Sequence, residues 1–305
     1  MLISVNLCQY FILFCFVLGF VLTFVSIHLL KCIYQRNSIL YVQTTMKSDK
    51  ANIIAVAGKG GTGKTVIASL ILKFLAESGA QRALAIDADP ATCLPSTLGV
   101  KVNKTIGDIR EEIASPSQVF FSEDMPTDML IEYKIDDIIV NTPLFSLLAM
   151  GRSEGIGCYC LINDMLRHFI DKLSARFTTI LIDCEAGLEH LSRRTTRDVD
   201  TMLVVSDPTK RGIDTALAIK NLAEKLHIHF QHIYLVLNKV TEDEAVKAAL
   251  LDMVKDSGLT LIGTVPEDEN ITQYDLAGKP IYDLEDHSPS VVAVREIAKK
   301  LDLLA

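Results

Sequence analysis

The residues most clearly suited to chemistry lie in the stretch GKGGTGKT, residues 58–65 of the 305-residue chain. The stretch satisfies the pattern G-x-x-x-x-G-K-[ST] and stands between an apolar run of strand length and a segment of helical length, which is the context in which the pattern binds nucleotide phosphates. Glycines let the backbone wrap closely around phosphate oxygens, and the N-terminus of the helix adds free N–H groups and partial positive charge. We expect Lys64 to reach the β- and γ-phosphates and the Thr65 hydroxyl to bind Mg²⁺.

A second chemically informative stretch is GRSEGIGCYC, residues 151–160, in which Cys158 and Cys160 stand one residue apart behind three glycines. Two thiolates supply half of the four ligands that a soft metal ion takes in a tetrahedral site. The alternative is that both cysteines are small buried residues at the start of a helix over 161–175. The glycines indicate an exposed loop, which favours metal binding.

The elements that must position these residues follow from the apolar pattern. We expect strands at 52–57, 82–87, 178–184, 201–207, 232–238 and 260–265, and helices at 65–79, 213–226, 243–257 and 288–305. Short continuous apolar strands alternating with amphipathic helices predict an α/β fold with a mainly parallel sheet and helices on both faces. Ser288 is expected near the N-cap of the last helix and Pro289 in its first turn.

Composition limits the partners and the compartment. The formal net charge of −8, without a long basic run, argues against nucleic acid as a partner. Seven cysteines, an odd number at irregular spacing, argue against a disulfide framework and for a reducing compartment.

The first forty-five residues have a different composition from the rest. Residues 11–30, FILFCFVLGFVLTFVSIHLL, carry no charge and are long enough to span a bilayer as a helix. Lys31 and Arg36 follow, so the positive-inside rule places the remainder in the cytoplasm. Met46 begins MKSDKANIIAVAGKGG, which is typical of a cytosolic start. We therefore expect residues 1–45 to be either a signal anchor or an upstream extension of the gene model, and residues 46–305 to be a P-loop domain that lies in the cytoplasm in both cases.

The early lysine at position 59 connects the loop to a known family. GKGGTGKT resembles the deviant Walker A loop of the family that contains the MinD and ParA ATPases, the nitrogenase iron protein and the arsenite-pump ATPase. In that family the early lysine crosses a dimer interface to the partner's nucleotide. The resemblance therefore implies a homodimer in which Lys59 and Lys64 are both catalytic. The implied ATP cradle comprises Gly58, Lys59, Gly60, Gly61, Thr62, Gly63, Lys64 and Thr65.

Other motifs follow in the order of that family. IDADP, residues 86–90, resembles the first switch, in which Asp89 would position the attacking water and Asp87 would lie near the metal. LIDCEAG, residues 181–187, resembles the Walker B strand with the second switch, and Asp183 would bind Mg²⁺ through water.

Two segments resemble the family's base-binding segments. In LNKV, residues 237–240, Asn238 would hydrogen-bond adenine, and in VPEDENI, residues 265–271, the backbone would wall the pocket. The residues of that wall are Pro266, Glu267 and Asp268.

The cysteine pair narrows the resemblance to the CooC-type nickel-insertion ATPases that mature carbon monoxide dehydrogenase. In that branch a Cys-x-Cys after a GR-x-E-G-x-G segment binds metal at the dimer interface, and EAGLEH (185–190) and SDPTKRGIDTA (206–216) are similar to its sequences. The resemblance implies that Cys158 and Cys160 of two chains hold one Ni²⁺ or Zn²⁺. It also implies that the client is apo carbon monoxide dehydrogenase or acetyl-CoA synthase.

Three other functions stay open. A reductase like the nitrogenase iron protein needs a second ligand cysteine well beyond the Walker B strand, whereas Cys184 directly follows Asp183 and is expected to pack in the core. A MinD/ParA-like positioning or partition ATPase leaves Cys158 and Cys160 without a role. A sulfur-rich scaffold for iron–sulfur assembly normally has C-x-x-C near its C-terminus, and no cysteine follows Cys184.

Overall fold

The strands form one sheet in the order β3-β4-β2-β5-β1-β6-β7-β8. The computed structural model describes residues 51–79, 82–114, 134–152, 169–170, 172–186, 198–225 and 229–304. All neighbouring strands in it are parallel except β3 and β4, which are antiparallel. The strands are β1 (Asn52–Gly58), β2 (Ala83–Ala88), β3 (Val140–Asn141), β4 (Ser146–Ala149), β5 (Thr179–Ala186), β6 (Asp198–Ser206), β7 (His229–Val240) and β8 (Leu261–Pro266).

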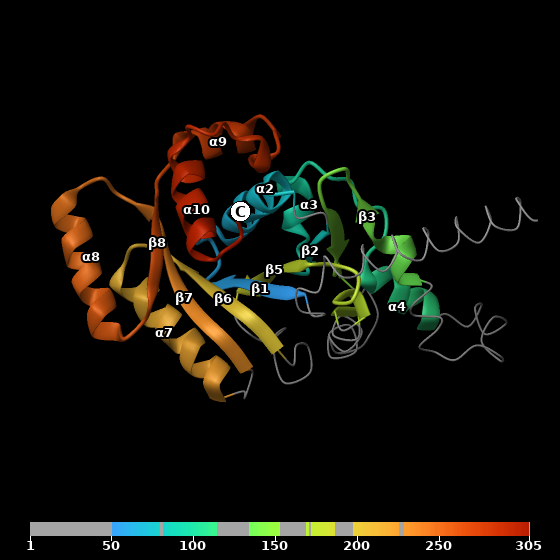
Figure 1. Cartoon of the computed structure of the whole chain (residues 1–305), viewed down its shortest axis with the longest axis horizontal. Helices are drawn as coiled ribbons and strands as arrows, with labels where there is room; N and C mark the ends of the chain where they lie inside the picture. The colour runs from blue at the N-terminus through green and yellow to red at the C-terminus, as the bar shows by residue number, and fades with distance from the viewer. Residues whose placement is uncertain are drawn as a thin grey trace, which may run out of the picture. The chain divides into compact units, whose positions relative to one another are not determined.

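Helices cover both faces of this sheet, and Figure 1 shows α2 and α10 above it and α7 below it. The helices are α2 (Lys64–Glu77), α3 (Cys93–Thr97), α4 (Ile106–Ala114), α7 (Lys210–Lys225), α8 (Glu244–Ser257), α9 (Glu269–Leu276) and α10 (Pro289–Lys300), with a 3₁₀ turn η2 (Ile281–Asp283). The mainly parallel α/β fold expected from the sequence is confirmed.

The central strand β1 explains why its sequence reads as an unbroken apolar run. Ile53 and Ala55 pack into the core on the side of α4, α7 and α8. Ile54 and Val56 pack into the core on the side of α2 and α10. Successive side chains of a strand point to opposite faces, so a strand buried on both sides needs apolar residues at every position.

The outer strands of the described sheet are both poorly suited to pairing with another chain. β3 has only two residues. On β8, at the other end, the carbonyl of Ile262 accepts a hydrogen bond of 2.6 Å from Lys300 Nζ of α10. Short edge strands and edge lysines are devices that protect a sheet against edge-to-edge association.

The strand order reverses at the carboxyl end of β1. The chain leaves β1 for β2, two places away across β5, whereas β6 lies on the other side of β1. Ligands of open α/β sheets bind where the order reverses in this way, outside the carboxyl ends of the strands. GKGGTGKT begins at this point.

In the part of the chain that the structure describes, no helix has the length and apolar character needed to cross a membrane. The expected span at 11–30 lies outside the described residues.

Candidate nucleotide site

The loop between β1 and α2 has a backbone that only glycine can provide at two positions. Gly58 has φ of 148°, and a Cβ atom there would lie 2.2 Å from the carbonyl oxygen of Val205 in β6. Gly63, the N-cap residue of α2, has φ of 89°, and a Cβ atom there would lie 2.3 Å from Asn238 Nδ2. The helix begins at Lys64, so its free N–H groups open onto the loop as the sequence predicts.

The two lysines of the loop occupy different environments. The Lys59 carbonyl accepts hydrogen bonds from Thr62 Oγ1 at 2.8 Å and from Lys64 Nζ at 3.4 Å. Lys64 is therefore folded over its own loop and buried, whereas Lys59 is exposed. A folded ammonium suits the neutralisation of bound phosphate, and an exposed one suits contact with a partner chain.

Asp87 and Asp183 lie side by side where β2 and β5 run parallel, since they are register partners in that pair of strands. Both are buried, with exposures of 0% and 1%. Burial raises the pKa of Asp87 from 3.8 to about 7, against the hydrogen bond from the Asp89 N–H. Burial also raises the pKa of Asp183 to about 6, against a hydrogen bond from Thr65 and the charge of Lys64. Two carboxyl groups so placed favour binding of a cation.

One oxygen of this pair has no partner. Asp183 Oδ1 is buried and accepts no hydrogen bond within the described part of the chain. A buried carboxylate oxygen left unpaired is costly, so its presence calls for a ligand. The adjacent hydroxyl of Thr65 and these carboxylates are hard oxygen donors, which suit Mg²⁺. The residues present therefore fit the magnesium ion of a P-loop site.

Asp89 begins the turn that leads from β2 to α3. Its N–H donates to Asp87 Oδ1 at 3.0 Å, and its own Oδ1 accepts the N–H of Ala91 at 2.8 Å. The carboxyl group is half-buried beside the acidic pair. Its role in positioning water stays a prediction.

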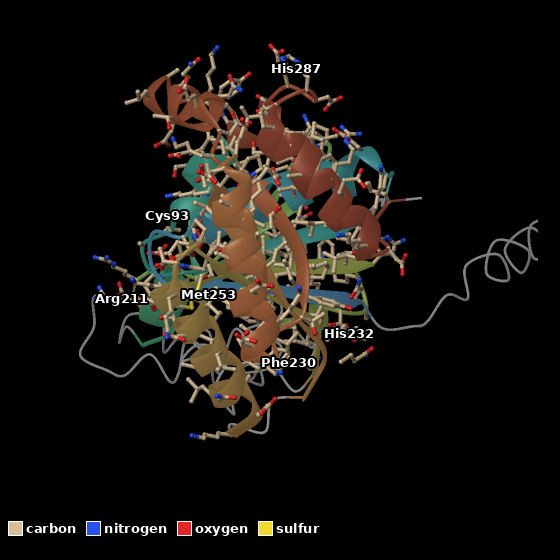
Figure 2. All side chains as sticks on the ribbon, turned by 90° about the vertical axis from the view of Figure 1, so that its left-hand side faces the viewer. Cys93, Arg211, Phe230, His232, Met253 and His287 are labelled. Carbon is tan, nitrogen blue, oxygen red and sulfur yellow. The ribbon has the colours of Figure 1, made fainter. Side chains whose placement is uncertain are left out.

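In Figure 2, Cys93, which follows β2, and Arg211, which follows β6, lie toward the left of the view, at one end of the strands, whereas His232, near the start of β7, lies toward the right, at the other end. The carboxyl ends of the parallel strands thus share one edge. The P-loop, Asp87, Asp183 and Asn238 all belong to that edge.

The two segments expected to bind the base are brought together by the pairing of β7 with β8. Val240 and Pro266 are register partners, and the N–H of Glu267 donates to the Val240 carbonyl at 3.3 Å. Asn238 is buried against the phosphate loop, and its Nδ2 donates to the carbonyl of Thr62 at 2.8 Å. Its contact with adenine stays a prediction.

The carboxylate of Asp268 has a structural task that the sequence did not indicate. It caps α9 by accepting the N–H of Asn270 at 3.0 Å. It also accepts hydrogen bonds from Ser288 Oγ at 2.5 Å and from Ser290 Oγ at 2.6 Å, both at the start of α10. Burial opposes ionisation, but these hydrogen bonds outweigh it and lower the pKa of Asp268 below its ordinary value. Ser288 is the N-cap residue of α10 and Pro289 its first residue, as expected, although the Ser288 hydroxyl bonds to Asp268 and does not cap its own helix.

Residues 53–281 match the family model described as the CobQ/CobB/MinD/ParA nucleotide binding domain. The chain belongs to this family. It is therefore a P-loop ATPase domain, whose ligand is a nucleotide with Mg²⁺.

Relatives within the family carry different names. An uncharacterized ATP-binding protein of Methanocaldococcus jannaschii is 45% identical over 253 residues, covering 82% of this chain and 98% of that protein. The carbon monoxide dehydrogenase accessory protein CooC of Rhodospirillum rubrum is 35% identical over 250 residues, covering 76% and 89%. The solved structure of the MinD cell division protein of Aquifex aeolicus aligns with a TM-score of 0.62 at 21% identity, covering 84% and 98%. This last likeness concerns the fold.

The cysteine pair of this family member lies outside the described residues, as do residues 187–190 of the second switch, which spans 183–190. The structure describes the chain before the pair as far as Arg152. Within the described ranges no group of three or more His, Cys, Asp or Glu side chains is placed to hold a metal. Cys184 is buried, as expected, and burial raises the pKa of its thiol.

One contact in the site was not predicted from the sequence. Lys239 Nζ donates to the carbonyl of Gly61 in the phosphate loop at 3.2 Å. The only signal in the sequence is its position directly after Asn238 in LNKV.

Proposed function

We propose that this ATPase is a homodimeric metallochaperone that uses ATP hydrolysis to insert nickel into carbon monoxide dehydrogenase or acetyl-CoA synthase. The observation that carries the proposal is the Cys-x-Cys pair at 158–160, in a chain 35% identical to a carbon monoxide dehydrogenase accessory protein. Nickel is the cargo in this scheme, and Zn²⁺ is a substitute that thiolates also bind well.

The chain segment that precedes the cysteine pair supports coupling between metal binding at the pair and nucleotide binding at the phosphate loop. The N–H of Met150, directly after β4, donates to the Asp87 carbonyl at 2.8 Å, and the Met150 carbonyl accepts the N–H of Gly107. The chain that leads to the cysteines therefore leaves the sheet in hydrogen-bonded contact with the residue that opens the first switch. A movement of the Asp87 backbone would be passed through Met150 to residue 151.

In the proposed cycle, the phosphate loop, Lys59, the acidic pair, the cysteine pair and Asp89 each have one role. ATP binds at residues 58–65, and Lys59 of each subunit stabilises charge on the neighbour's nucleotide. Thr65, Asp87 and Asp183 would hold a magnesium ion, which would supply charge neutralisation at the phosphates. Closure brings four thiolates of Cys158 and Cys160 together. Hydrolysis, with water positioned by Asp89, separates the subunits and removes two of the four ligands, which releases the ion to the client.

Metal stoichiometry tests the shared site. In the presence of ATP, the wild-type chain is expected to bind about half an equivalent of Ni²⁺ or Zn²⁺, because one tetrahedral site serves two chains. The Cys158→Ala/Cys160→Ala variant is expected to bind little metal and to keep its affinity for ATP. Equilibrium dialysis with metal analysis measures both. One full equivalent per chain that survives the double substitution would rule out the shared site.

A MinD-like positioning ATPase is the second candidate, because the family model that the chain matches is that of the CobQ/CobB/MinD/ParA nucleotide binding domain. An experiment in cells distinguishes the two functions. If the double cysteine variant restores the phenotype of a deletion strain as well as the wild type does, the MinD-like function is correct and the metallochaperone is wrong.

We also propose that residues 46–305 form a cytoplasmic ATPase domain and that residues 1–45 either anchor it or are not translated. Mass spectrometry of the native N-terminal peptide distinguishes a chain that starts at Met1 from one that starts at Met46.

A further inference from the structure

The end of β7 holds the phosphate loop with two consecutive side chains. Asn238 Nδ2 donates to the Thr62 carbonyl at 2.8 Å, and Lys239 Nζ donates to the Gly61 carbonyl at 3.2 Å. In a regular strand, consecutive side chains point to opposite faces, so two neighbours cannot both reach one loop. The strand must therefore depart from regular geometry here.

The departure is visible in the backbone. Lys239 has φ of 58°, a left-handed conformation that a residue with a side chain rarely adopts. The pairing of β7 with β8 shifts register between Leu237 and Val240, which is the irregularity that re-aims a side chain. Backbone strain of this kind persists where surrounding contacts fix it, and it is concentrated at functional sites.

The two bonds orient two peptide planes of the loop. The C=O and N–H of a trans peptide unit point in opposite directions, so a carbonyl held on one side directs the next N–H to the other. Holding the carbonyls of Gly61 and Thr62 toward β7 turns the N–H groups of Thr62 and Gly63 away from β7. Thr62 N indeed points back into the loop, where it donates to the Lys59 carbonyl at 3.4 Å.

We propose that Lys239 is a positioning residue that holds the phosphate loop in its nucleotide-binding conformation before ATP arrives. It acts on the loop backbone and does not touch the reacting atoms. Its contribution is the same for ATP and ADP, because both use the same loop N–H groups. The inference depends on the ATPase activity alone and is independent of the metal cargo.

The test compares substitutions at Lys239 in the full-length chain, with ADP and ATP affinities from calorimetry and steady-state ATPase rates. Lys239→Met removes the donor and is expected to raise the Kd of both nucleotides about fivefold to tenfold, with kcat changed less than about twofold. Lys239→Arg keeps a charged donor and is expected to restore affinity to within about twofold of wild type. Lys239→Gly relaxes the left-handed backbone but loses the donor, so it is expected to bind as weakly as Lys239→Met.

The matched control is Lys220→Met. Lys220 Nζ also donates to a glycine carbonyl, that of Gly258 at 3.4 Å, but far from the loop in the fold. The Lys220→Met variant is expected to leave the affinities for ADP and ATP unchanged. Repeating the titrations at about 1 M KCl, where the Debye length falls to about 3 Å, separates positioning from simple attraction of phosphate. A persistent loss for Lys239→Met supports positioning. The proposal is wrong if that loss vanishes at high salt, if Lys239→Met matches the control, or if Lys239→Gly binds like wild type.

Discussion

At the scale of residues, the site is governed by the buried acidic pair. Asp87 and Asp183 carry pKa values raised to about 7 and about 6, chiefly by burial. The folded chain therefore holds protons that the unfolded chain releases at the same pH. Because the native state binds more protons, the free energy of unfolding falls as the pH rises from about 4 through 7. A cation near the pair reverses this effect by favouring both ionised forms.

This pH dependence is measurable without nucleotide. Between pH 5 and 6.5 the free energy of unfolding of wild type is expected to fall more steeply than that of Asp87→Asn, by up to about 1.4 kcal/mol per pH unit for one proton. Urea unfolding at several pH values measures the slopes. Asp256→Asn, at an exposed carboxylate, is the control for charge and should keep the wild-type slope. Equal slopes for wild type and Asp87→Asn would contradict the raised pKa.

At the scale of elements, Asp268 connects the predicted base-binding segment to two helices through hydrogen bonds. Its carboxylate accepts hydrogen bonds from the start of α9 and from Ser288 and Ser290 of the α10 start. The β8–α9 turn, which carries the predicted wall of the base pocket, is thereby fixed to the core.

Removing that carboxylate should cost more than removing an ordinary cap. Asp268→Ala leaves the buried Ser288 and Ser290 without their acceptor and is expected to lower the free energy of unfolding by about 2–4 kcal/mol. Asp243 caps α8 at an exposed site by accepting the N–H groups of Ala245 and Val246. Asp243→Ala is therefore expected to cost only about 1 kcal/mol. Urea denaturation compares the two, and equal losses would show that the serine bonds contribute nothing.

The elements also show what could be predicted from sequence. β1 and β2 were predictable because burial on both faces demands continuous apolar residues. β4, four residues long, and α3, five residues long, were not predicted, since neither is long enough to show a period. The site residues on the P-loop and at strand ends followed from one motif. Lys239 could not follow, because its role depends on a left-handed backbone and a register shift that no residue type in LNKV indicates.

At the scale of the whole molecule, we expect the exposed Lys59 to act in the assembly of the dimer and the buried Lys64 to act in nucleotide binding. Lys59→Ala is expected to bind ATP normally and to lose both hydrolysis and ATP-induced dimerisation, because the charge it places on the neighbour's nucleotide is absent. Lys64→Ala is expected to lose ATP binding itself. Calorimetric titration with ATP distinguishes the two variants, and light scattering and a phosphate-release assay measure the dimerisation and hydrolysis that both are expected to lose. Dimerisation of Lys59→Ala with ATP at wild-type strength would exclude a role across the interface.

The two ends of the described sheet limit how copies of the chain can assemble. Within the described sheet, β3 has only two residues and the Ile262 carbonyl of β8 accepts a hydrogen bond from Lys300, so each outer strand offers a neighbouring copy fewer free backbone groups. Head-to-tail stacking of sheets would give an open filament, whereas pairing through one self-complementary face closes after two copies. In the pairing proposed for Lys59, the nucleotide face is the self-complementary one, so ATP governs a finite pair whose formation and separation can be counted one cycle at a time.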